Sequence, residues 1–150
     1  MGEADNPAAL ARAVADAMWA EDRASTGLGM RLEAVAPGRA VLSMVVTERM
    51  VNGHGICHGG FIFALADSAM AVASNSHGAR AVAQHCAVTF LRPGRLGETL
   101  RAEAAERARA ARSGIYDVRV TGAGADTVAE FRGHTRAIRG GFFPADPPSE

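Results

Sequence analysis

Residues 51–71 read VNGHGICHGGFIFALADSAMA, a loop rich in glycine and histidine that runs directly into an apolar stretch. The apolar stretch predicts a helix that begins near His58 or Gly59 and ends at about His77. Its side chains are apolar on nearly every side, which is typical of a helix that is buried all round. One carboxylate, that of Asp67, lies in the middle of this helix, and burying an unpaired carboxylate is costly. A structural or functional role is therefore needed to explain why Asp67 is present in this helix.

The segments around this helix predict strands and one further helix. Asn6 is expected to cap an amphipathic helix over residues 5–23, with Pro7 in its first turn. Farther along the chain, turns rich in glycine and proline separate alternating apolar segments. These predict a hairpin at 30–46 about Pro37 and Gly38, a strand at 81–92, and a hairpin at 115–138 about the turn 122–126.

Residues 99–114 are ambiguous between helix and strand. Their alanine, glutamate and arginine residues favour a helix. Leu100, Ala102 and Ala104, however, alternate with charged residues, and the segment lies between two predicted strands. We therefore interpret it as an edge-like strand.

Together these elements predict an α+β fold in which a curved antiparallel sheet wraps around one central apolar helix, with the short N-terminal helix outside. A chain of 150 residues fits one domain, which we place at residues 1–140. The proline-rich residues 141–150 are expected to form a poorly ordered tail. The edges of such a sheet need cover, and oligomerisation commonly supplies it.

Composition narrows the classes of function. Arginine supplies all 16 basic residues, which balance 16 acidic ones, and the chain has no basic stripe with interleaved aromatic residues, so nucleic acid is not an expected partner. Asp67 interrupts the apolar run from Phe61, which is shorter than the roughly 18 residues of a membrane span. The N-terminal region lacks the features of a secretory signal, and two cysteines without one indicate reduced thiols. We expect a cytoplasmic protein with no membrane partner.

Histidine, cysteine and serine residues offer alternative chemistries, but none matches an established pattern. The candidate metal ligands are His54, Cys57, His58, His85 and Cys86. Their spacing is not that of a standard zinc site, so no metal is expected. The adjacent Cys57 and His58 side chains point in different directions and make a poor nucleophile–base pair. Ser68 and Ser74 lack the glycine context of a serine hydrolase.

His58, Gly59 and Gly60 at the predicted helix start suggest a different chemistry. Unpaired N–H groups at a helix N-terminus suit an anion or a developing oxyanion, and with Asp67 as base they would form a hydrolytic centre for a carbonyl. The alternatives are a plain flexible turn and an aspartate that is exposed or locally hydrogen-bonded. Within one helix, Gly59 and Asp67 lie roughly 12 Å apart. Two antiparallel copies of the helix across a two-fold axis would bring them together, so the sequence favours a homodimer with shared sites.

Three longer motifs carry a family resemblance. Residues 52–67 follow the pattern N-G-H-G-x-x-H-G-G-x-x-x-x-L-A-D, residues 90–104 read FLRPGRLGETLRAEA, and residues 114–136 read GIYDVRVTGAGADTVAEFRGHTR. Over about residues 10–140 the chain resembles the hotdog-fold acyl-CoA thioesterases, and among them the phenylacetic-acid-degradation (PaaI/PaaD) family. The resemblance implies the hotdog fold, a dimer with sites at the helix–helix interface, and commonly a dimer of dimers, which is a tetramer.

The resemblance also implies roles for single residues. Asp67 falls on the catalytic carboxylate, which acts as general base or nucleophile. Gly59 falls on the glycine whose backbone N–H polarises the thioester carbonyl, and His58 shapes that turn. Asn52 falls on the asparagine that positions the water or the carbonyl. The neighbouring substrate-binding residues are expected to be Gly60, Phe61 and Ser68.

Coenzyme A is expected as part of the substrate, and no separate cofactor is implied. Its nucleotide would lie outside the helix interface, where arginine side chains can bind phosphates. The candidates are Arg92, Arg95 and Arg112. For each of them, a solvated surface arginine is the alternative interpretation.

Our hypothesis from the sequence is an acyl-CoA thioesterase acting on phenylacetyl-CoA or its ring-hydroxylated forms. One alternative is a hotdog thioesterase for medium-chain or other aryl acyl-CoA. A second is a non-catalytic acyl-CoA-binding hotdog module, which would lack the carboxylate present here at Asp67. A third is a hotdog dehydratase, which commonly uses a histidine base.

Overall fold

The computed structural model describes residues 6–143. In this part of the chain the helices are α1 (Pro7–Glu21), α2 (Arg23–Gly27), the 3₁₀-helix η2 (Glu48–Met50) and α3 (Gly59–Asn75). The strands are β1 (Arg31–Ala36), β2 (Arg39–Val45), β3 (Ala79–Phe90), β4 (Thr99–Ala110), β5 (Ser113–Thr121) and β6 (Thr127–Gly141). Most of the predicted tail, residues 144–150, lies outside the described residues, whereas Gly141 ends β6 and belongs to the domain.

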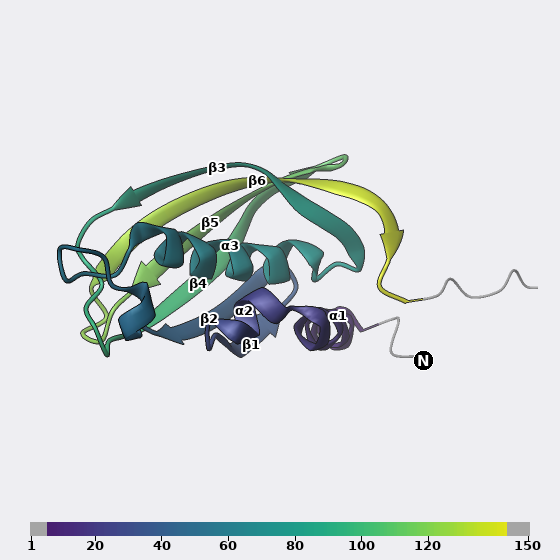
Figure 1. The fold of residues 1–150 in the computed structure, drawn as a ribbon. Coiled ribbons are helices and arrows are strands. Elements are labelled where there is room, and N and C mark those ends of the chain that lie inside the picture. Colours follow the sequence, from purple (N-terminus) through teal and green to yellow (C-terminus); the bar gives the residue numbers. More distant parts are fainter. Residues whose placement is uncertain (1–5, 144–150) are drawn as a thin grey trace, which may run out of the picture.

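One antiparallel sheet holds the strands in the order β1-β2-β4-β5-β6-β3. The sheet curves around α3, which lies along its concave face, and α1 packs against β1 and α3 (Figure 1). The predicted α+β fold is therefore confirmed, together with both predicted hairpins. No helix among residues 6–143 is long and apolar enough to cross a membrane.

α3 forms the centre of the core. Leu65, Ala66 and Ala69 are completely buried beneath the sheet. The sheet also has a small residue at the interface, because Gly133 on β6 lies directly opposite Met70. Small residues on both layers let the strands approach the helix closely, which gives the dense packing that a protein core requires.

The C-terminal end of α3 comes two residues earlier than predicted. The helix ends at Asn75, where the Ser76 hydroxyl donates a hydrogen bond to the Ala73 carbonyl at 2.7 Å. Gly78 then reverses the chain with a φ of 97°, a conformation that favours glycine. The Asn75 side chain bonds both the N–H and the carbonyl of Ala81, at 2.9 and 3.0 Å. These bonds join the helix end to the start of β3.

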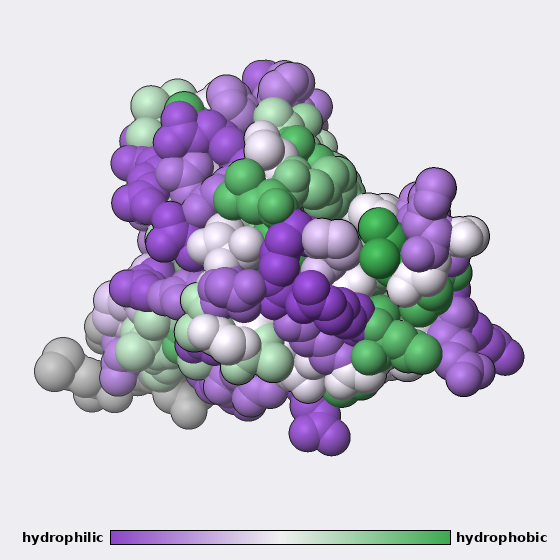
Figure 2. Space-filling model, turned by 90° about the vertical axis from the view of Figure 1, so that its left-hand side faces the viewer, coloured by the Kyte–Doolittle hydropathy of each residue, from purple (hydrophilic) through white to green (hydrophobic). Residues whose placement is uncertain are grey.

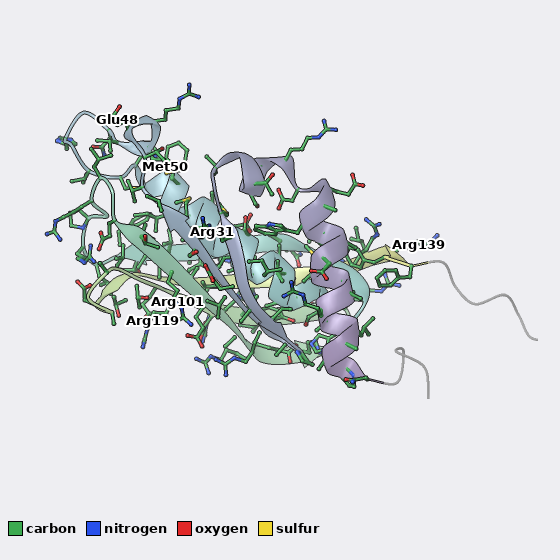
Figure 3. The ribbon with its side chains drawn as sticks, turned by 90° about the horizontal axis from the view of Figure 1, so that it is seen from below. Arg31, Glu48, Met50, Arg101, Arg119 and Arg139 are labelled. Atoms are coloured by element: carbon green, nitrogen blue, oxygen red, sulfur yellow. The ribbon has the colours of Figure 1, made fainter. Side chains whose placement is uncertain are left out.

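β4 confirms the predicted strand but corrects its place in the sheet. Leu100, Ala102 and Ala104 are fully buried, as their alternation indicated. β4 is not edge-like, however, because it pairs with β2 on one side and β5 on the other. The charged side chains of β4 are compatible with this interior position because they lie on the outer face of the sheet. Arg101 on β4 and Arg119 on β5 are exposed on this face (Figure 3).

The N-terminal region contains one helix more than the sequence predicted. α1 begins at the expected cap, because the Asn6 side chain accepts the N–H groups of Ala8 and Ala9. It ends at Glu21, two residues before the predicted end, and Arg23–Gly27 form the short helix α2, which was not predicted. Asp22 starts α2 by accepting the Ser25 N–H at 2.9 Å. A local cap therefore overrides the weak helix propensity of serine, threonine and glycine in this segment.

The surface around the start of α3 is mixed in polarity. Figure 2 faces this end of the molecule and shows apolar residues in separate patches among polar ones. Phe90, Leu91 and Leu96 contribute to the exposed apolar surface of the chain and belong to the end of β3 and the loop after it. This loop lies next to the candidate site.

The contact between Gly133 and Met70 predicts that adding one methyl group at residue 133 lowers the stability of the protein. A Cβ at residue 133 would lie 2.0 Å from Met70 Sδ and 3.1 Å from the Phe131 ring. Gly133→Ala is expected to lower the free energy of unfolding by about 1–3 kcal/mol through overpacking, measured by urea denaturation. The control is Gly124→Ala, whose Cβ would meet nothing nearer than 3.7 Å. Equal stability of the two variants would contradict this account of the interface.

Candidate active site

Asn52 organises the loop that leads into α3. Its Oδ1 accepts the N–H groups of His54 and Ile56, at 2.9 and 3.4 Å. Its backbone N–H donates to the Ile56 carbonyl at 2.8 Å. The side-chain amide nitrogen has no hydrogen-bond partner within residues 6–143. Asn52 thus shapes the loop with its oxygen while its NH₂ group remains able to donate to a ligand or water.

In the first turn of α3, one backbone N–H group is free and the next one is capped by a side chain. His58 Nδ1 accepts the Gly60 N–H at 2.9 Å, and the His58 N–H donates to the Met50 carbonyl at 2.7 Å. In the part of the chain that the structure describes, the Gly59 N–H has no acceptor. Because Nδ1 accepts, a neutral His58 ring has its hydrogen on Nε2. The capping histidine therefore leaves the Gly59 N–H as the available donor.

Gly59 lies beside an apolar cleft of about 430 Å³. Phe90 forms one wall of this cleft, and a Cβ at residue 59 would lie only 2.9 Å from its Cζ. It is also lined by Asn52, Ile62, Arg92 and Pro93. A backbone donor in such apolar surroundings interacts more strongly with a developing negative charge than it would in water.

Asp67 is half-buried on α3, and burial raises the pKa of its carboxyl above the ordinary value. Its carboxylate has no hydrogen-bond partner among residues 6–143. It lines a second cleft, of about 960 Å³, together with apolar side chains that include Met18, Met70 and Val82. The cleft at Gly59 is a different one. Within one chain the predicted donor and the predicted carboxylate therefore do not face a common space.

The predicted substrate-binding residues separate into two groups. Gly60 is exposed at the start of α3, and the Phe61 ring meets the His58 ring edge-on at a centroid distance of 6.1 Å. Ser68 instead points at α2, where its Oγ lies 2.7 Å from Ser25 Oγ. Because Ser25 donates its own hydroxyl hydrogen to Asp22 at 2.6 Å, Ser68 acts as donor to Ser25. The Ser68 hydroxyl thus joins α2 to α3 immediately beside Asp67.

The three arginines predicted to bind coenzyme A lie in different surroundings. Arg92 is enclosed between the carboxylates of Glu98 and Asp126, an arrangement that disfavours a role in phosphate binding. Arg95 is exposed in the same loop. Arg112 is exposed in the turn between β4 and β5, where its carbonyl accepts the Ala137 N–H. The structure does not bring the three together, and the roles of Arg95 and Arg112 stay predictions.

Two contributors to the site could not be recognised from the sequence. Phe90 reaches Gly59 from the end of β3, and no local pattern predicts this long-range contact. Ser25 reaches Ser68 across 43 residues of sequence. Only the spacing of Asp22 and Ser25, which is that of a helix cap, was available as a signal.

Comparison with known proteins places these features in a family. Residues 54–129 match the family model described as the thioesterase superfamily. The acyl-coenzyme A thioesterase PaaI of Escherichia coli K12 is 44% identical over 126 residues, which cover 84% of this chain and 90% of that protein. The solved structure of the E. coli PaaI protein from the phenylacetic acid degradation operon has a TM-score of 0.89 and 42% identity, and the match covers 91% of this chain and 99% of that one.

A structure with a bound ligand is also similar. A Streptococcus mutans protein solved with acetyl-CoA has a TM-score of 0.71 and 26% identity, covering 73% of this chain and 88% of that one. Together these matches confirm the hotdog arrangement expected from the sequence.

The raised pKa of Asp67 predicts a stability cost that depends on pH. Folded Asp67 binds its proton more tightly than the unfolded chain does, so stability is lost as the pH rises from the ordinary value of 3.8 through the raised pKa. Asp67→Asn cannot ionise and is expected to be more stable than the wild type at about pH 7, with the difference much reduced near pH 3. Urea unfolding at both pH values measures this.

Asp16→Asn is the matched control for this prediction. Asp16 is an exposed residue in an ion pair with Arg12, at 3.1 Å. Its replacement is expected to bring no gain at neutral pH. An Asp67→Asn protein no more stable than the wild type at neutral pH would show that burial of this carboxylate carries no cost.

Proposed function

This chain belongs to the thioesterase superfamily and is a thioester hydrolase, and from that premise we propose that it hydrolyses acyl-coenzyme A in which the acyl group is phenylacetyl or a ring-hydroxylated phenylacetyl. The observation that carries the proposal is the presence, on one helix, of the Gly59 N–H and the half-buried Asp67 carboxylate, neither of which has a hydrogen-bond partner among residues 6–143. The similar E. coli protein is named for acyl-coenzyme A, and its structure for the phenylacetic acid degradation operon. Both names support this substrate class.

Two subunits are proposed to complete each site. Gly59 and Asp67 lie roughly 12 Å apart along one helix, which is too far for one carbonyl. β3 pairs only with β6 within residues 6–143, so one side of this 12-residue strand is open. It contains no proline, and open edges of this length are usually covered. Antiparallel pairing of two β3 strands would set two copies of α3 side by side, with Gly59 near Asp67 of the partner subunit.

The chemistry follows from these two groups. Ionised Asp67 accepts a proton from water as the water oxygen bonds to the thioester carbon, and the Gly59 N–H stabilises the carbonyl oxygen as it becomes negative. The carbon–sulfur bond then breaks, and the coenzyme A thiolate takes up the proton. A thiolate leaves readily, so one base and one oxyanion donor suffice. Direct attack by the Asp67 carboxylate on the carbonyl carbon is the alternative route.

The cleft beside Asp67 is suited to an apolar acyl group. It is lined mainly by small and apolar residues of α1, α3 and β3, with Met18 and Met70 on its walls. Thioether sulfur atoms make favourable contacts with aromatic rings and adapt to their shape. A phenyl ring one methylene group away from the thioester carbon would therefore find apolar contacts close to the proposed base.

Replacing Asp67 tests the proposed mechanism, and comparing substrates on the wild type tests the substrate class. We expect Asp67→Asn to lower kcat for phenylacetyl-CoA at least about 100-fold, because the proton acceptor is lost, measured as release of free coenzyme A. The wild type is expected to have a higher kcat/KM for phenylacetyl-CoA than for straight-chain acyl-CoA. Unchanged turnover of the variant would remove Asp67 from the mechanism, and a preference for medium chains would replace the acyl group proposed.

Subunit mixing tests the shared site. Proline is tolerated at the first position of a helix and lacks the N–H, so Gly59→Pro removes the donor while Asp67→Asn removes the base. Each variant alone is expected to be nearly inactive. Random mixing of the two yields heterodimers with one intact site each, so about a quarter of the wild-type activity should return.

Gly59→Ala is the steric control for the proline variant. It introduces the same Cβ against Phe90 but keeps the N–H, so it should retain more activity than Gly59→Pro. If mixed subunits exchange, as shown by a mass-tagged chain, yet regain no activity, each site is confined to one subunit.

A further inference from the structure

Arg92, at the start of the loop between β3 and β4, has every side-chain N–H group engaged. Its Nη1 and Nη2 donate to the two Glu98 carboxylate oxygens at 3.0 and 2.6 Å. Its Nε and Nη2 donate to the two Asp126 oxygens at 2.5 and 2.9 Å. The fifth N–H bonds the Pro93 carbonyl at 2.7 Å. We refer to Arg92, Glu98 and Asp126 as the Arg92 clamp.

The Arg92 and Glu98 members of the clamp are largely removed from solvent, and the clamp joins two loops. The Arg92 and Glu98 side chains are only 17% and 9% exposed. Glu98 also accepts the N–H groups of Arg95 and Ala123, both at 3.1 Å, and the hydrogen bonds from Arg92 are the main cause that lowers the pKa of Glu98 to about 2. A Cβ at Gly122 would lie 1.8 Å from Arg92 Nη2. The guanidinium therefore fills the space between the β3–β4 loop and the β5–β6 turn.

The loop held by the clamp contacts the segment just before α3, and the strand residue before the loop contacts the first residue of α3. The Gly94 carbonyl accepts the Cys57 N–H at 2.9 Å. Phe90, immediately before the loop, packs against Gly59. Cys57 and Gly59 are the two neighbours of the capping His58, so the loop determines where the chain lies just before the free N–H. Moving the loop would move that donor.

We propose that the clamp positions the Gly59 N–H for the thioester carbonyl, acting through the Gly94 carbonyl, and that Arg92 is a positioning residue instead of a ligand for coenzyme A phosphates. This inference rests on the proposed function of Gly59. The guanidinium has no N–H left to donate, and two carboxylates offset its charge. Its effect is therefore on geometry, and a transition-state donor that is displaced by less than an ångström loses much of its effect.

Arg92→Lys keeps the charge but cannot engage both carboxylates through paired N–H groups. We expect kcat to fall about 10-fold or more while KM changes less than about two-fold, because the donor acts mainly in the transition state. The same loss is expected with phenylacetyl-CoA and with the phenylacetyl thioester of pantetheine, which lacks the nucleotide. Hydrogen exchange measured by mass spectrometry should become faster across residues 57–61.

Two further variants make the test specific. Arg119→Lys is the matched control, since Arg119 and Glu130 form an exposed ion pair on the outer face of the sheet, and it should leave kcat, KM and exchange at 57–61 unchanged. Asp126→Asn removes only the more exposed carboxylate of the clamp, with a side chain 55% exposed. It replaces Arg92→Lys if that variant does not fold, and a smaller fall in kcat is expected.

The outcomes separate this inference from the proposed function. A wild type that hydrolyses neither phenylacetyl-CoA nor the pantetheine thioester would overturn the proposed function, and exchange at 57–61 would then still report whether the clamp holds the loop. If the wild type is active and Arg92→Lys raises KM for phenylacetyl-CoA but not for the pantetheine thioester, Arg92 would be assigned to phosphate binding. That result would overturn the role proposed for the clamp. Unchanged kcat and unchanged exchange in a folded variant would overturn it as well.

Discussion

The burial of most of α3 beneath the sheet is the constraint on which the rest of the structure depends. A 17-residue helix with so few polar positions is not stable on a surface, so the sheet has to curve around it. Small residues at the contact, such as Ala69 on the helix and Gly133 on β6, allow the close approach that this curvature requires. Asp67 lies on the side that the chain's own sheet leaves open, toward the larger cleft. The same packing therefore encloses the helix and exposes its single carboxylate to a ligand.

Patterns that are local in sequence predicted most of the fold, and long-range pairing accounts for what they missed. The helix start at Gly59 and the hairpin about Pro37 depend on neighbouring residues, and both are confirmed. Whether β4 lies at an edge depends on the order of strands, which no window of sequence contains. The two carboxylates around Arg92 show the same limit, since Asp126 is 34 residues away from it. An exposed arginine and an enclosed one look alike until these partners are known.

The candidate site was predictable in its composition but not in its hydrogen bonding. The spacing of Gly59 and Asp67 along one helix was enough to indicate that a single chain separates them, and the two clefts agree with this. Which N–H of the first turn remains free was not predictable, because it depends on the orientation of the His58 ring. Ser68 shows the same limit: next to Asp67 it suggested substrate contact, whereas its hydroxyl joins two helices. Side-chain direction decided each of these cases.

The contact between Gly122 and the Arg92 guanidinium has a consequence for the descent of this family. Any side chain at residue 122 would overlap the guanidinium where it now lies, so a glycine is required there for as long as the arginine keeps this position. Loss of the arginine removes that requirement, and a larger residue at 122 then prevents its return. The two positions are therefore expected to covary among relatives, with the arginine lost before the glycine. A lineage that has taken this step would need another way to hold its β3–β4 loop.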